Sequence, residues 1–139
     1  MRHHIFGAAA LALTCTLSTP VSAQQSGSRS VVSIYHAVPG HQAELLKWLA
    51  RQDQISAAAG NPRSQLYVHM DGDSWDYVLI APATTEAQDA AFDAAAKRMG
   101  VPTGPAAGIE FRKHIMSHTD TMTAGPTTAA EVLAALGEK

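Results

Sequence analysis

Two histidines and one arginine have the side-chain chemistry to carry a reaction in this chain. They are His69, His114 and Arg112, and an imidazole is the side chain best suited to act as a general acid or base near neutral pH. Arg112 precedes His114 by two residues, and its guanidinium is suited to hold a carboxylate or to stabilise a developing oxyanion. The alternative is that both histidines are hydrogen-bonded interface residues and that Arg112 pairs with Glu110.

Three aromatic side chains are the substrate-binding residues that we expect around the same cavity: Tyr35, Tyr67 and Trp75. Tyr35 falls in a segment that we expect to lie beside the strand of Arg112, so the two would share one wall. Tyr67 and Trp75 flank His69 in the chain and would form the opposite wall. Aromatic faces together with a few polar groups are typical of small-molecule sites.

The spacing of the histidines does not indicate a metal site, and we expect neither a metal nor another cofactor. His114 and His118 are four residues apart, but their segment is predicted as strand followed by loop rather than helix. Haem or metal binding through His69 or His114 stays open as an alternative. By alternation His36 is expected on the helix side of the sheet, as a structural residue or a loop anchor. His41 is expected to be a surface residue.

The first 25 residues, "MRHHIFGAAALALTCTLSTPVSAQQ", have the pattern of a secretory signal peptide. A short basic start precedes an apolar run from Ile5 to about Leu17, and Pro20 and small residues follow. The run is too short to span a membrane, which takes about 20 apolar residues. We therefore expect cleavage after Ala23, a periplasmic or secreted mature protein without a membrane anchor, and a flexible lead-in over residues 24–30.

Composition narrows the classes of function further. The formal net charge of the whole chain is −2, and no basic stripe is present, which argues against nucleic-acid binding. Cys15, the single cysteine, would leave with the signal peptide, so the mature chain would have neither a disulfide nor a thiolate nucleophile. Residues 31–139 are enough for one small domain, which favours oligomerisation as a way to bury more surface.

The mature sequence alternates between strand and helix patterns. We predict strands over 31–38, 64–70, 75–82 and 109–116, and helices over 41–59, 85–99 and 129–136. Thr85 with Gln88, and Thr128 with Glu131, have the spacing of capping boxes at two helix starts. The Asp71-Gly72 pair between two apolar runs predicts a hairpin turn.

This order is βαββαβ with an additional C-terminal helix, which predicts an α+β, ferredoxin-like fold with an antiparallel sheet. Its helices cover one side of the sheet only, and the other side needs a different cover. From the alternation of apolar residues we expect Val32, Ile34, Leu66, Val68, Ile109 and Phe111 under the helices. The side chains of Tyr35, Tyr67, His69, Arg112 and His114 would then face away from the helices, into the cavity.

The element order, the string "YHAVPG" leading into an amphipathic helix, and "DYVLIAPA" in the third strand resemble the dimeric α/β-barrel superfamily. Its members include antibiotic-biosynthesis-type monooxygenases, EthD-like proteins and NIPSNAP-like proteins. The resemblance covers roughly residues 31–118 and implies a homodimer in which two sheets pack face to face around ligand cavities. It transfers no catalytic residue.

The function we predict from the sequence is binding of a small molecule, with acid–base or oxygen chemistry on an aromatic or enolisable compound if the protein is an enzyme. His69 or His114 would move the proton, and Arg112 would stabilise the oxyanion. The alternative is a structural or interaction dimer without a ligand, in which the same side of the sheet only closes the interface.

Overall fold

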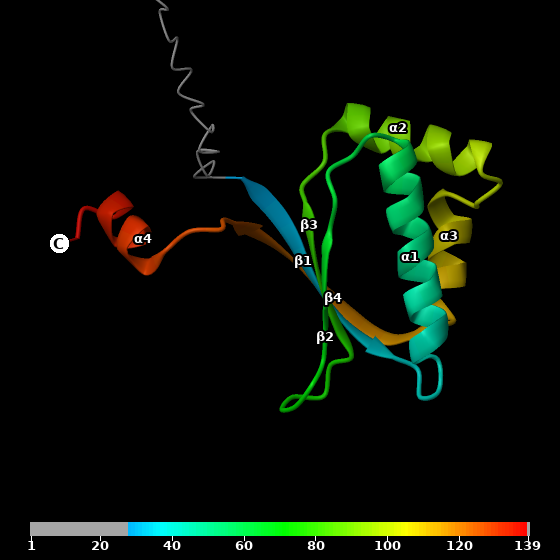
Figure 1. The fold of residues 1–139 in the computed structure, drawn as a ribbon, viewed down its shortest axis with the longest axis horizontal. Coiled ribbons are helices and arrows are strands. Elements are labelled where there is room, and N and C mark those ends of the chain that lie inside the picture. The colour runs from blue at the N-terminus through cyan, green and yellow to red at the C-terminus, as the bar shows by residue number, and fades with distance from the viewer. Residues whose placement is uncertain (1–27, 139) are drawn as a thin grey trace, which may run out of the picture.

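Four strands and four helices make up residues 28–138, the part of the chain that the computed structural model describes (Figure 1). The elements are β1 (Arg29–Ala37), α1 (Gln42–Ala58), β2 (Gln65–Val68), β3 (Tyr77–Pro82), α2 (Glu86–Arg98), α3 (Gly104–Arg112), β4 (Ile115–Ala124) and α4 (Ala129–Ala135). The expected signal peptide over 1–23 lies outside the described residues. The lead-in was expected to extend to residue 30, but β1 already begins at Arg29.

The sheet is antiparallel with the strand order β2-β3-β1-β4. This is the order of a ferredoxin-like fold, and the predicted fold class is confirmed. The helices α1, α2 and α3 all lie on one side of the sheet, and α4 lies beyond the end of β4 on the other side (Figure 1). One side of the sheet is therefore layered with helices and the other carries none of them.

Both capping boxes predicted from the sequence are present in the structure. Thr85 and Gln88 form the predicted capping box of α2, in which the Gln88 amide donates to the Thr85 hydroxyl. Thr128 and Glu131 do the same for α4. Such caps satisfy backbone N–H groups that the first turn leaves without partners. Among the described residues, no helix has the length and apolarity needed to cross a bilayer.

The core lies between the sheet and α1. Its buried members are Tyr35 and Ala37 of β1, Tyr77 of β3, and Leu45 and Leu49 of α1. Leu45 and Leu49 are one helical turn apart, so they project from the same side of α1 toward the sheet. A second buried cluster, of Ile55, Ala95 and Ala96, joins α1 to α2.

The predicted orientation of β1 is wrong. The helix side of this strand carries Ser33, Tyr35 and Ala37, all buried, whereas Val32 and Ile34 face away from the helices. Small side chains on either side of Tyr35 allow α1 to approach the sheet closely. The apolar side chains of Val32 and Ile34 had favoured the opposite orientation. That criterion failed because both sides of this strand carry apolar groups.

The predicted fourth strand over 109–116 is also wrong. Residues 104–112 form α3, and β4 instead runs over 115–124, so that only Ile115 and Met116 of the predicted strand are in a strand. Pro105 suits the first turn of a helix, and Arg112 in the last turn interacts favourably with the helix dipole. Alternating threonines mark the true strand, and threonine suits a pleated surface.

The side of the sheet without helices is called the open face below. Direct partners in an antiparallel ladder point to the same side, so the register assigns its residues. Val32 is opposite Ile80 and Ile34 is opposite Val78 at its centre. Tyr67 of β2 lies opposite Val78 of β3. On the other edge, β4 contributes Thr119, Thr121 and Thr123. The open face is thus a β-branched apolar strip with a border of hydroxyl groups.

Candidate functional site

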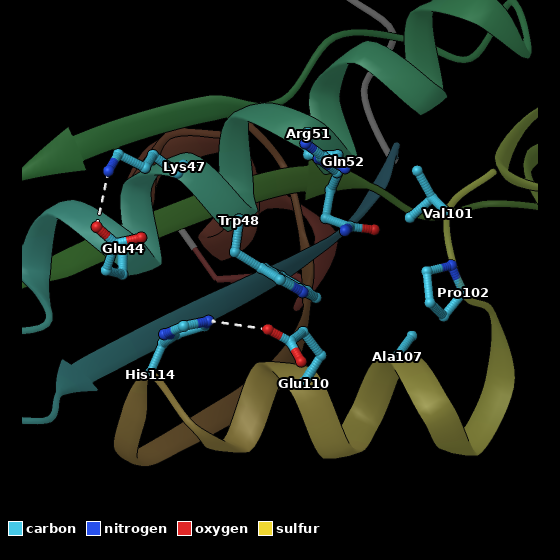
Figure 2. Close-up of a pocket in the computed structure, with 10 residues that line it drawn as sticks. All are labelled: Glu44, Lys47, Trp48, Arg51, Gln52, Val101, Pro102, Ala107, Glu110 and His114. Carbon is cyan, nitrogen blue, oxygen red and sulfur yellow. Dashed lines mark hydrogen bonds and ion pairs between the residues drawn. The ribbon is translucent and has the colours of Figure 1, made fainter. Parts of the chain in front are cut away.

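A cleft of about 410 Å³ lies between α1 and α3 on the helix side of the sheet (Figure 2). The residues that line it are Glu44, Lys47, Trp48, Arg51, Gln52, Val101, Pro102, Ala107, Glu110 and His114. The first five come from α1, and the rest come from α3 and its flanking segments. Small-molecule sites typically have volumes of about 300–1,000 Å³, so the cleft is large enough for an organic ligand.

Helical spacing aligns the polar side chains of both walls. Glu44, Lys47 and Arg51 are three and four residues apart in α1, so they follow one another along one side of the helix. Glu110 and His114 have the same relation at the end of α3. The amide of Val38 donates to the carbonyl of His114 at 3.0 Å, which fixes the chain where α3 passes into β4.

Trp48 forms the aromatic surface of the cleft. Its indole stacks on the ring of Phe111, with centroids 4.4 Å apart and planes inclined by 28°. Phe111 in turn meets Tyr35 edge to face at 5.9 Å. Burial, the largest cause, raises the pKa of Tyr35 above its usual value, so its phenol stays neutral at physiological pH. The indole thus rests on a rigid aromatic support that continues into the core.

His114 is the titratable group with the most constrained surroundings in the cleft. Its Nε2 lies 3.6 Å from Oε1 of Glu110, and its side chain is only 16% exposed. The hydrogen bond that Lys113 donates to Glu110 lowers the pKa of that carboxyl, so Glu110 is ionised at neutral pH. The Glu110 carboxylate therefore places a negative charge beside the imidazole ring of His114.

The other ring nitrogen of His114, Nδ1, is buried and has no hydrogen-bond partner among residues 28–138. The same holds for Nδ1 of His41, whose ring centroid lies 5.9 Å from that of His114. The expectation that His41 is a solvated surface residue is therefore wrong, because it packs beside His114 at the start of α1. A buried polar atom without a partner carries a desolvation cost.

The two cations of the cleft differ in their pairing. Lys47 donates to Glu44 at 2.7 Å, and this contact also lowers the pKa of the Glu44 carboxyl. Arg51 forms no ion pair within the described part of the chain. Its guanidinium is available to an anionic group of a ligand that lies on the Trp48 indole.

The six predicted site residues do not share one cavity. Tyr35 is in the core under the helices, and His114 lines the cleft. Arg112 is an exposed residue of α3 and does not line the cleft. Glu110, its expected partner, instead contacts Lys113 and His114.

The remaining three lie on the β2–β3 hairpin. His69 and Trp75 are in contact there, with ring centroids 5.0 Å apart, and the His69 amide donates to the Asp76 carbonyl. Tyr67 lies on the open face, and its hydroxyl donates to Gln65. The hairpin and the cleft belong to opposite edges of the sheet, because β2 and β4 are its outer strands.

Two further observations concern histidines and metals. His36 is on the open face rather than under the helices, but its Nδ1 contacts the Ser74 carbonyl at 3.2 Å, so its predicted role as a loop anchor is confirmed. In residues 28–138 no group of three or more metal-ligating side chains comes together.

The sequence analysis missed Trp48, Arg51 and Glu110 as site residues. Trp48 lies in the helix expected over 41–59, where an apolar residue is most simply interpreted as core. Glu110 was considered only as a partner for Arg112. For Glu110 the sequence does contain a usable signal. Glu110 and His114 have the spacing of a helical pair, and this pairing becomes visible once residues 104–112 are recognised as helix.

Comparisons with known proteins bear on the fold. No family model matches the chain, and no curated protein matches its sequence. A variant of SnoaB from Streptomyces nogalater, described as a cofactor-independent oxygenase, superposes with a TM-score of 0.50 at 22% identity, over 73% of this chain and 96% of that one.

Two other solved structures align over similar lengths. A dimeric protein of unknown function and ferredoxin-like fold from Bacteroides fragilis NCTC 9343 has a TM-score of 0.47 at 12% identity, over 73% of this chain and 99% of that one. A NIPSNAP domain protein from Burkholderia xenovorans has 0.43 at 15% identity, over 73% and 96%. Strand order and structural likeness together show that this chain has a ferredoxin-like fold.

Proposed function

We propose that this protein is an exported homodimer that binds a small aromatic or enolisable compound in the cleft between α1 and α3. In this proposal His114 acts as its acid–base group without a cofactor. The observation that carries it is the position of His114, which is half-buried beside an ionised Glu110 in a cleft lined by the Trp48 indole. Export rests on the signal-peptide pattern of residues 1–23.

The cleft suits a flat ligand with an ionisable oxygen. The Trp48 indole offers a face for stacking, which is worth about 0.5–1.5 kcal/mol beyond burial for an aromatic pair. Arg51 supplies a cation for the oxygen, and Val101 and Pro102 supply an apolar end wall (Figure 2). In this proposal Arg51, which lines the cleft, stabilises the oxyanion, the role that the sequence had suggested for Arg112.

The chemistry begins with proton transfer. The imidazole of His114 takes the proton from a hydroxyl or an acidic C–H of the ligand, and the Glu110 carboxylate stabilises the resulting imidazolium. Arg51 stabilises the enolate oxygen that forms. Such an electron-rich carbanion can transfer two electrons to dioxygen as a new C–O bond forms, and the imidazolium returns the proton to the resulting peroxide anion, which gives the hydroperoxide. The description of SnoaB as an oxygenase supports the second step by analogy of fold only.

The open face supports the homodimer. Its central residues Val32, Ile34, Val78 and Ile80 are only partly exposed in one chain and have no helix over them. A sheet with one uncovered apolar side needs a second layer, because water contact with that side is unfavourable. A second copy with the same strip provides a self-complementary layer.

We expect naphthoate, an aromatic carboxylate, to quench the fluorescence of Trp48. The expected result for a Trp75→Phe variant is unchanged quenching, because Trp75 lies on the hairpin. Replacing Arg51 with Gln should weaken the apparent affinity about tenfold, as one charge-assisted contact of about 1.4 kcal/mol would be lost. Titration followed by fluorescence measures both. Quenching that persists in Trp48→Phe and is lost in Trp75→Phe would place the ligand at the hairpin instead.

Ile34→Glu is expected to raise the dissociation constant of the dimer about tenfold or more. It places a carboxylate at the centre of the open face, where its desolvation opposes association. Sedimentation equilibrium against concentration gives the constant. Ile109→Glu is the matched control, because Ile109 is exposed on α3. A chain that sediments as a monomer at every concentration contradicts the proposed dimer.

A further inference from the structure

The C-terminal helix α4 projects from the rest of the chain (Figure 1). None of its residues is buried, and the apolar side chains of Val132, Leu133 and Leu136 are 46%, 48% and 71% exposed. Within residues 28–138, no hydrogen bond joins positions 127–138 to the remainder. Isolated helices shorter than about 12–15 residues are marginal in water, so two turns such as these need a surface to pack on.

A second cleft, of about 450 Å³, lies on the open face near the start of β1 and the end of β4. Its floor is formed by Val32, Ile80 and the Tyr67 ring, and Arg63 lines its border. The residues assigned to the open face by the register include no carboxylate. The lining of this cleft therefore combines apolar side chains with one positive charge, that of Arg63.

We propose that α4 of one copy docks in this open-face cleft of a second copy, so that each chain helps to cover the sheet of its partner. The inference rests on the homodimer of the proposed function and adds which segment crosses between the two copies. Val132, Leu133 and Leu136 supply the apolar contact. Glu131 and Glu138 give the segment a negative charge that complements Arg63.

The geometry favours a partner copy over the chain's own sheet. Residues 123–126 themselves line the cleft, and α4 follows after only Thr127 and Thr128. From that point the helix leads away from its own sheet (Figure 1). The same direction carries it toward a second copy seated on the open face.

Hydrogen–deuterium exchange of the exported chain tests the docking, at one concentration where sedimentation shows monomer and another where it shows dimer. We expect residues 129–136 to exchange about tenfold more slowly in the dimer, because docking protects amides that fray in a free helix. Leu133→Glu should remove this protection and weaken dimerisation about tenfold. Ala134→Glu on the opposite side of α4 is the matched control and should change neither.

Each other outcome overturns the inference in a recognisable way. Equal, fast exchange of 129–136 in both states overturns the docking of α4 and leaves the homodimer standing. Equal, slow exchange in both states places α4 on its own chain. A chain that stays monomeric throughout overturns the docking and the homodimer together, whereas naphthoate binding remains a separate test of the α1–α3 cleft.

Discussion

Replacing His114 with glutamine is expected to lower turnover of a dihydroxynaphthalene by about 10²–10⁴-fold, the usual contribution of a general acid–base group. Glutamine keeps a polar side chain of similar reach but cannot hold a transferable proton at neutral pH. Turnover is measured as oxygen uptake and, independently, as exchange of the acidic C–H for deuterium by NMR. The exchange assay isolates the proton transfer from the oxygen step.

Two variants control this experiment. His36→Gln removes a histidine that contacts the hairpin loop on the open face, on the opposite side of the sheet from the cleft, and should leave turnover unchanged. His69→Gln tests the other histidine named from the sequence, whose Nε2 is also buried and without a partner among residues 28–138. If His69→Gln abolishes C–H exchange and His114→Gln does not, the reactive group lies on the hairpin, and the cleft between α1 and α3 is not the site.

Tyr35→Ala should reduce the free energy of unfolding by about 3–5 kcal/mol, as for other large aromatic residues deleted from a core. Tyr35 is 6% exposed and contacts Phe111 from beneath the helices. Tyr67→Ala is the matched control on the opposite side of the sheet, where the side chain is 50% exposed, and should cost less than about 1 kcal/mol. Urea unfolding followed by circular dichroism measures both.

The comparison must be made on the single chain. Tyr67 belongs to the open face, so its deletion also affects the proposed dimer, and unfolding is followed at dilutions where stability no longer depends on concentration. A small loss of unfolding free energy for Tyr35→Ala together with a large loss for Tyr67→Ala would contradict the assignment of the two sides of the sheet. It would return Tyr35 to the exposed side and remove the aromatic support of Trp48.

The two sides of the sheet thus have separate tasks. The helix side holds the core and, at its border, the cleft in which Trp48, Glu110 and His114 meet. The open face is available for association with a second copy. Separating the tasks means that ligand binding and dimerisation can be tested by variants that do not touch one another.

Much of the fold followed from local patterns. The capping pairs at Thr85 and Thr128, the long helix after Gly40 and the βαββαβ order are encoded over stretches of a few residues. Each involves contacts between neighbours in the chain. His114 was identified as a candidate from its residue type and from a strand alternation that the structure does not bear out, yet the structure places it in a cleft.

Other features needed the tertiary structure. A period of two residues separates the side chains of a strand into two sets but does not say which set meets the helices. In β1 both sets could be buried, and the contacts of Tyr35 with Phe111 and of Ala37 with α1 decided the orientation. Residues 109–112 fit a strand by alternation and a helix by spacing, and packing of Phe111 on Trp48 accompanies the helical choice.

The sequence by itself determined the order of β1, α1, β2, β3, α2 and α4, whereas α3 and the true position of β4 were not foreseen. Export remains what the signal-peptide pattern predicts. Only the tertiary structure decided the site, because Trp48 and His114 lie 66 positions apart and come together where α1 packs beside α3. Local patterns act between neighbouring residues, whereas a cleft depends on the relative placement of two helices on a sheet. That placement is set by burial of the whole core.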